Sequence, residues 1–100
     1  MNMQQMMMQA QKMQRELQKA QEELAKKEFE VSKAGLVTVK VLGNKEIVSV
    51  HIDEDGFDAD NKEMVEEMIA SAINEAFEQI DEASEEINKR ITGRSGGFGF

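Results

Sequence analysis

The sequence predicts an α+β fold in which a long helix, a three-stranded antiparallel sheet and a second long helix follow one another. Two observations predict this order. Near both ends of the chain, apolar side chains recur at steps of three and four residues, the period of an amphipathic helix. Between these segments they alternate with polar side chains, which is typical of strands with one buried face. The expected order of elements is therefore α-β-β-β-α.

The first helix is expected to begin near Met3 and to end before Glu28. Most residues between its apolar positions are Gln, Glu, Lys or Arg, which are good helix formers. The small and apolar residues form an uninterrupted heptad seam, which predicts a packed contact within the core or with a second copy. The seam consists of Met3, Met6, Ala10, Met13, Leu17, Ala20 and Leu24.

Three short strands are expected between residues 28 and 53, separated by turns at Ala34-Gly35 and Gly43-Asn44. A tight turn at Gly43-Asn44 would place Val39 opposite Val48, and Val37 opposite Val50. One face of this sheet would be aliphatic and the other polar, so we expect it to be covered on one side only. The alternating apolar positions are Phe29, Val31, Val37, Val39, Val41, Val48, Val50 and Ile52.

After an acidic loop at residues 53–56, Asp60 and Glu63 fit a capping box that would start the second helix. The apolar stripe of this helix runs from Val65 to about Ile91. Residues 1–91 are thus expected to form a single domain, and residues 92–100 a flexible Gly-rich tail.

The lengths of these elements predict association of the chain with a second copy. The helices would be roughly 37 Å and roughly 45 Å long, whereas strands of about seven residues span only about 23 Å. Their apolar stripes would project beyond the sheet into water. We therefore expect a twofold homodimer with helical arms that extend from a sheet-centred body.

Composition narrows the functional class. The chain has 100 residues, which suits one domain without a deep substrate cleft, and its lack of Cys excludes disulfides. No apolar run suggests a membrane span or a secretory signal, so a cytoplasmic protein is expected. The net charge of −8 is unevenly distributed: residues 1–27 carry five basic and three acidic side chains, and residues 57–91 carry three and eleven.

Three stretches, in this order and spacing, resemble the YbaB/EbfC family of nucleoid-associated proteins: residues 8–14 (MQAQKMQ), residues 35–53 from GLVTV to VSVHID, and residues 60–69 (DNKEMVEEMI). The resemblance implies an intertwined, tweezer-shaped homodimer whose projecting helices grip double-stranded DNA. It also implies a role in nucleoid organisation and gene expression, with no catalysis and no cofactor.

Basic residues on the first helix are the candidate DNA contacts. Lys12, Arg15, Lys19 and Lys26 form one stripe opposite the apolar seam, and Lys27 lies near its end. A second cluster, at the end of the second helix, consists of Lys89, Arg90 and Arg94. The alternative is a solvated face with stabilising Glu–Lys pairs on the first helix, and cations that offset the helix dipole on the second.

No other residues predict chemistry. The methionines of the seam lack Cys or His neighbours, which favours adaptable packing at a dimer contact over a Cu(I) site. Ser49 and His51 have no partners for a catalytic triad, so no catalytic residue, metal site or small-molecule substrate is expected. The alternative function is an acidic, coiled-arm scaffold that engages another protein without binding DNA.

Overall fold

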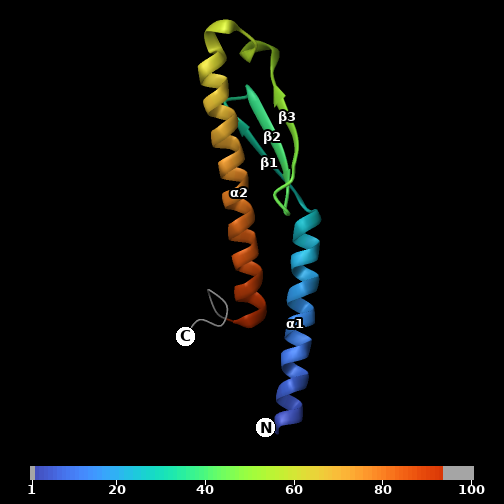
Figure 1. The fold of residues 1–100 in the computed structure, drawn as a ribbon. Helices are drawn as coiled ribbons and strands as arrows, with labels where there is room; N and C mark the ends of the chain where they lie inside the picture. The colour runs from blue at the N-terminus through green and yellow to red at the C-terminus, as the bar shows by residue number, and fades with distance from the viewer. Residues whose placement is uncertain (1, 94–100) are drawn as a thin grey trace.

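The computed structural model describes residues 2–93 and has the predicted α-β-β-β-α order (Figure 1). Two short 3₁₀ turns, Glu54–Gly56 and Ala59–Asn61, join the sheet to the second helix. The other elements are α1 (Met3–Lys26), β1 (Glu28–Lys33), β2 (Val37–Leu42), β3 (Ile47–Ile52) and α2 (Lys62–Thr92). The predicted fold class is therefore confirmed.

The molecule is a long rod of 69 × 24 × 15 Å with α2 as its spine. The sheet and α1 are stacked end to end along α2, so that its first half covers the sheet and its second half lies beside α1 (Figure 1). Part of each helix therefore projects beyond the sheet, as the predicted lengths required. We refer to α1 and the second half of α2 together as the arm.

The core lies between α2 and one face of the sheet, whose strand order is β1-β2-β3. On the central strand, Val37, Val39 and Val41 are completely buried, as are Ala72 and Ala76 on α2. The small alanine side chains allow the helix to approach the valines closely. This packing buries the alternating valines of β2, in agreement with the sequence pattern.

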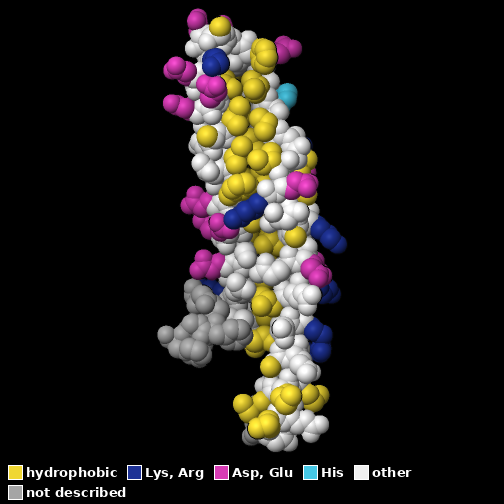
Figure 2. Space-filling view, viewed as in Figure 1, with side chains coloured by type: hydrophobic (Ala, Val, Ile, Leu, Met, Phe, Trp, Pro, Cys, Tyr) yellow, Lys and Arg dark blue, Asp and Glu magenta, His cyan; other side chains and the backbone are white. Residues whose placement is uncertain are grey.

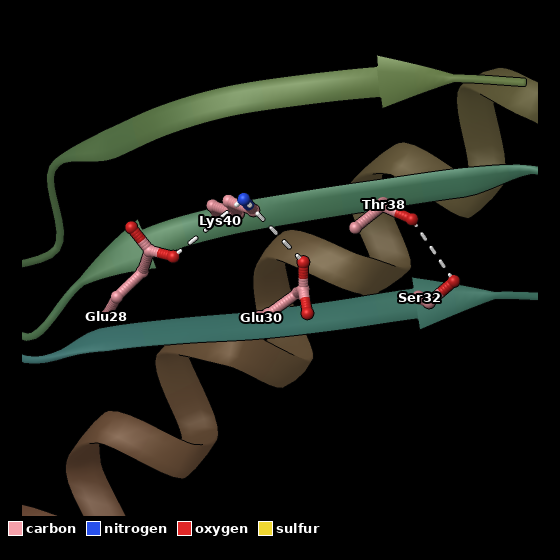
Figure 3. Close-up of polar contacts among 5 residues, drawn as sticks. All are labelled: Glu28, Glu30, Ser32, Thr38 and Lys40. Atoms are coloured by element: carbon pink, nitrogen blue, oxygen red, sulfur yellow. Dashed lines mark hydrogen bonds and ion pairs between the residues drawn. The ribbon is translucent and has the colours of Figure 1, made fainter.

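The opposite face of the sheet is polar, as its alternation predicts (Figure 3). Lys40 of β2 lies between Glu28 and Glu30 of β1, with Nζ 4.0 Å from a carboxylate oxygen of each. Beside it, the Thr38 hydroxyl donates a 3.2 Å hydrogen bond to that of Ser32. This face needs no cover, because its side chains pair with one another or meet water.

The predicted register of the second hairpin is wrong by two residues, since Val39 faces Val50 rather than Val48. The reversal is longer than the expected two-residue turn. The Lys45 N–H donates to the Leu42 carbonyl at 2.7 Å, and Lys45 adopts a left-handed φ of 71°. A β-bulge at Val48 follows, and the additional residues shift the pairing of the entire strand.

The predicted capping box at Asp60 is also wrong. Asp60 lies within the second 3₁₀ turn, and its N–H donates to the Asp58 side chain at 3.0 Å. The first residue before α2, Asn61, makes no side-chain capping bond. The 3₁₀ turn leads directly into the helix and takes the place of a side-chain cap.

Helix α2 ends at Thr92, one residue into the predicted tail, because Gly93 adopts a left-handed φ of 72° and its N–H bonds to the Lys89 carbonyl. The rest of the predicted tail, including Arg94, lies outside the described residues. Within residues 2–93, no helix combines the length and the apolar character needed to cross a bilayer.

Candidate nucleic-acid interface

The arm is held together by the second half of the predicted seam. Leu24 is buried, and Leu17 and Ala20 are half-buried where α1 faces α2. Gln21 adds two hydrogen bonds to Ser84 of α2, one through each end of its amide. The orientation of α1 about its own axis is therefore fixed, which decides where its remaining side chains point.

The first half of the seam is not covered. Met3, Met6 and Ala10 are exposed, and Met13 is the first half-buried residue of α1. The end of α1 projects beyond the last turn of α2 (Figure 1). Within one chain, the seam is thus a core contact only from Met13 onwards.

The predicted basic stripe lies on the outer side of α1. Lys12, Arg15, Lys19 and Lys26 are all exposed. They follow one another at helical spacing on the side opposite Leu17 and Leu24, so they point away from α2. In Figure 2, Lys and Arg side chains accordingly line the α1 side of the lower half of the molecule.

Ion pairing separates the basic residues of the chain into two groups. Those of the sheet and of the start of α2 each have a carboxylate within ion-pair distance: Lys33 pairs with Glu75, Lys40 with Glu28 and Glu30, Lys45 with Asp81, and Lys62 with Glu66. Within residues 2–93, the predicted DNA contacts form no ion pair. These are Lys12, Arg15, Lys19, Lys26, Lys27, Lys89 and Arg90.

The two predicted basic clusters differ in their surroundings. Lys27 and Arg90 border a hollow between α1 and α2 that Glu82 and Glu86 also line, and Lys27 lies 5.4 Å from the ring centre of Phe29. Lys89 borders a second hollow with the same two glutamates. The cluster at the end of α2 is therefore mixed with acidic side chains.

The α1 stripe meets acidic neighbours at Lys26, which borders a hollow with Glu22, and at Lys19. Lys19 shares a hollow with Glu16 and Glu23 of its own helix and with Arg90 of α2. Of the predicted contacts, the structure thus brings Arg90 close to both Lys19 and Lys27. The acidic residues of α2 gather mainly on its own side of the rod (Figure 2).

Sequence reasoning missed an apolar band that runs along the α2–β3 side of the sheet (Figure 2). Helix α2 covers β1 and β2, which leaves the edge strand β3 with Ile47 44%, Val48 49% and Val50 42% exposed. Beside it, Ile52, Val65 and Ile69 line an open apolar groove together with the 81% exposed Phe57. The sequence pattern predicted core positions for Val48 and Val50, because it does not indicate which strands of the sheet are covered by a helix.

The Gln21–Ser84 contact was also missed, although a signal existed. Ser84 is a polar residue inside the apolar stripe of α2, and such a position needs a hydrogen-bonding partner when the stripe is packed. The partner could not be found from sequence, since Gln21 lies on the other helix.

Comparison with known proteins shows which family and which relatives this chain is similar to. The sequence profile of the YbaB/EbfC DNA-binding family matches residues 1–95. A nucleoid-associated protein of Staphylococcus carnosus is 51% identical over 94 residues, which are 92% of this chain and 90% of that protein. A nucleoid-associated protein of Agathobacter rectalis is 48% identical over 63 residues, 63% of this chain and about half (56%) of the relative's length.

The fold is shared with a solved structure. The crystal structure of an uncharacterized protein from Helicobacter pylori superimposes with a TM-score of 0.73 and covers 91% of this chain and 97% of the other. The sequence identity is 22%, so this match supports the fold alone.

Proposed function

The chain belongs to the YbaB/EbfC DNA-binding family, and we propose that it binds duplex DNA as a homodimer with little sequence specificity. The observation that carries the proposal is the separation of the cations. Those of the sheet half are paired with carboxylates, whereas those of the arm within residues 2–93 form no ion pair. Unpaired cations on a projecting helix are available to phosphates without first breaking a contact.

The basic stripe of α1 is suited to the DNA backbone rather than to base edges. Lys12, Arg15, Lys19 and Lys26 occupy four turns along one side of a straight helix, and none has an aromatic neighbour on that side. Phosphate contacts position a protein on DNA but carry no sequence information. Binding through this stripe is therefore expected to tolerate most sequences.

The net charge of −8 makes the placement of the acidic residues important. Most of these residues lie on α2 and on the acidic turn before it, at the other end or side of the rod from the α1 stripe (Figure 2). Screening at physiological salt limits repulsion between exposed charges to about 8 Å. DNA seated along the outer side of α1 would therefore meet the cations of the stripe together with Glu16, Glu22 and Glu23 of the same helix, and would be little affected by the acidic residues of α2.

The homodimer is supported by the apolar band that one chain leaves open. Phe57 and Ile69 line one open groove, and Val50 is exposed on β3, the strand that also contributes Ile52 to this groove. A soluble monomer seldom exposes such a band, and a twofold partner is the simplest way to cover it. Pairing through the sheet halves would leave the two arms projecting, each with its own basic stripe.

The function proposed from this arrangement is organisation of DNA in the bacterial nucleoid, in the cytoplasm, with effects on DNA conformation and gene expression. A second candidate is favoured by the acidic residues of α2. Glu63, Glu67 and Glu78 are exposed and form no ion pair within residues 2–93. Such a surface suits a scaffold that engages a basic protein.

Fluorescence anisotropy of a labelled duplex, titrated at about 50 and about 200 mM salt, tests the DNA proposal. We expect binding that weakens steeply with salt. In the α1 variant, with Lys12, Arg15, Lys19 and Lys26 all changed to Gln, the affinity should fall at least about tenfold, and the salt slope should flatten by about one unit per lost phosphate contact.

The matched control removes the same number of cations from the sheet half, with Lys33, Lys40, Lys45 and Lys62 changed to Gln. This variant has the same net charge as the α1 variant, so it separates a binding surface from an effect of total charge. Equal losses in both variants would overturn the assignment of the α1 stripe. Failure of the wild type to bind at the lower salt would overturn DNA binding in favour of the scaffold.

A further inference from the structure

The end of α1 carries four methionines that nothing in the described chain covers. Met3, Met6, Met7 and Met8 are 77%, 57%, 56% and 63% exposed. They gather at the end of the arm that projects beyond α2 (Figures 1 and 2). We call them the methionine cluster. Large apolar side chains that are exposed side by side often mark a binding surface.

The cluster occupies two sides of its helix: Met3, Met6 and Met7 share the side of the apolar seam, and Met8 lies on the other side. Successive residues are rotated by about 100° in an α-helix, so Met8 lies on nearly the opposite side from Met6. A helix that lies flat in a protein groove or on a membrane presents its apolar side chains on one side. Methionines on two sides suit a helix whose end is inserted into its partner.

The charges beside the cluster favour a polyanionic partner. Residues 2–11 carry no charged side chain, the first two charges are Lys12 and Arg15, and the first acidic residue is Glu16. Lys12 is four residues from Met8, about 6 Å along the helix axis and on nearly the same side. Met8 is thus in line with the basic stripe that the proposed function assigns to DNA phosphates, and the other three methionines lie on the seam side of the same helix end.

We propose that the methionine cluster inserts between adjacent base pairs of duplex DNA and bends it. The inference rests on the proposed function, because the α1 stripe must first bring the arm to DNA. Proteins that shape DNA wedge apolar side chains into a base step from the minor groove, and methionine is among the residues they use. Its unbranched, flexible thioether can follow the narrow gap between partly unstacked bases.

Dimensions explain why insertion and bending would occur together. The minor groove of B-DNA is about 6 Å wide, whereas a helix with its side chains is about 10–12 Å across. The end of α1 can enter only if the groove opens, and opening the groove at an unstacked step kinks the duplex. With Met8 in the groove, Lys12 and Arg15, which lie on the same side of the helix, would stand near the phosphates at its rim.

The four glutamines of the same segment fit this placement. Gln4, Gln5, Gln9 and Gln11 are exposed and alternate with the methionines around the helix. Their amides both donate and accept hydrogen bonds, as sugar oxygens and minor-groove base edges require. An end of this composition can displace water from the groove without burying a charge.

The test compares bending with binding. Duplexes of about 30 base pairs carry a donor and an acceptor dye at their ends, with either a central TA step or a stiff A-tract. A second TA duplex carries 2-aminopurine at the TA step. The fluorescence of 2-aminopurine rises when the base unstacks. We expect the wild type to raise energy transfer and 2-aminopurine fluorescence on the TA duplex, and to do so less on the A-tract.

The decisive variant changes Met3, Met6, Met7 and Met8 to Gln, which has similar helix propensity. It should lose both optical signals while its affinity, from anisotropy, falls by less than about tenfold. The matched control changes the same residues to Leu and should retain both signals, because leucine also acts as a wedge.

Each other outcome has a definite meaning. Wild-type binding without bending, or bending that survives the Gln changes, would overturn this inference and leave the proposed function standing. Conversion of the homodimer to a monomer by the Gln changes, seen in sedimentation, would assign the cluster to a second copy and overturn it as well. Absence of duplex binding by the wild type would overturn the proposed function, and this inference with it.

Discussion

Gln21 on α1 and Ser84 on α2 hold the arm together through a reciprocal pair of hydrogen bonds. The Gln21 amide nitrogen donates to the Ser84 carbonyl at 3.4 Å, and the Ser84 hydroxyl donates to the Gln21 amide oxygen at 3.2 Å. The residues are 63 positions apart in sequence, so the contact is made by the fold and not by either helix alone. It fixes the rotation of α1 that turns the basic stripe outward.

Changing Ser84→Ala should destabilise the protein by about 1 kcal/mol, because the Gln21 amide oxygen loses its donor in a half-buried position. The measurement is urea unfolding followed by circular dichroism. Ser71→Ala is the matched control, since Ser71 is exposed on the same helix and the intrinsic gain from alanine is equal. Equal unfolding midpoints for the two variants would contradict a stabilising role for the contact.

Gly43→Ala should destabilise the fold by at least about 2 kcal/mol through overpacking. A Cβ atom at Gly43 would lie 1.8 Å from the Leu24 carbonyl oxygen. The backbone cannot retreat easily, because the Gly43 N–H donates to the Lys27 carbonyl at 2.8 Å. Thermal unfolding compares it with Gly35→Ala, where nothing lies within 4 Å and the cost comes from a φ of +70°. A smaller loss of stability for Gly43→Ala than for Gly35→Ala would contradict the close approach of Gly43 to the Leu24 carbonyl.

Ala72→Leu should lower the free energy of unfolding by about 1–3 kcal/mol. Ala72 is completely buried where α2 packs on the valines of β2, so a larger side chain would overpack this contact. Ala70→Leu is the control on the same helix, where the side chain is exposed and the change should stay within about 0.5 kcal/mol. Chemical unfolding of both variants measures the difference. Similar stabilities would mean that α2 lies farther from the sheet.

Val50→Asp should shift the proposed homodimer toward monomer and raise its dissociation constant at least about tenfold, or about 1.4 kcal/mol. Val50 is 42% exposed in one chain, and a partner that covers it would bury an unpaired carboxylate. Ser49→Asp places the same charge on the opposite, polar face of β3 and should leave the dimer intact. Sedimentation at micromolar concentration, with circular dichroism to verify folding, distinguishes them. A wild type that sediments as a monomer would rule out the dimer itself.

The sequence determined the order and nature of the elements, because these depend on local periodicity. The steps of three and four residues from Met3 to Leu24 specify a helix, and the alternating valines at 37, 39 and 41 specify a strand with one buried face. It also identified the basic stripe of α1, since four residues at helical spacing share one side of any helix. These inferences need only the geometry of a single element.

Tertiary structure decided what each face meets. The register at Val50 depended on the left-handed backbone conformation of Lys45 and on a bulge at Val48. Neither feature can be predicted from the pattern of apolar and polar residues. The exposure of β3 depended on which strands α2 covers. The ion pair between Lys45 and Asp81 depended on a contact between segments that are distant in sequence. Sequence periodicity shows that a side chain lies on an apolar or polar face, but burial and ion pairing are properties of two surfaces brought together, and only the folded chain supplies the second.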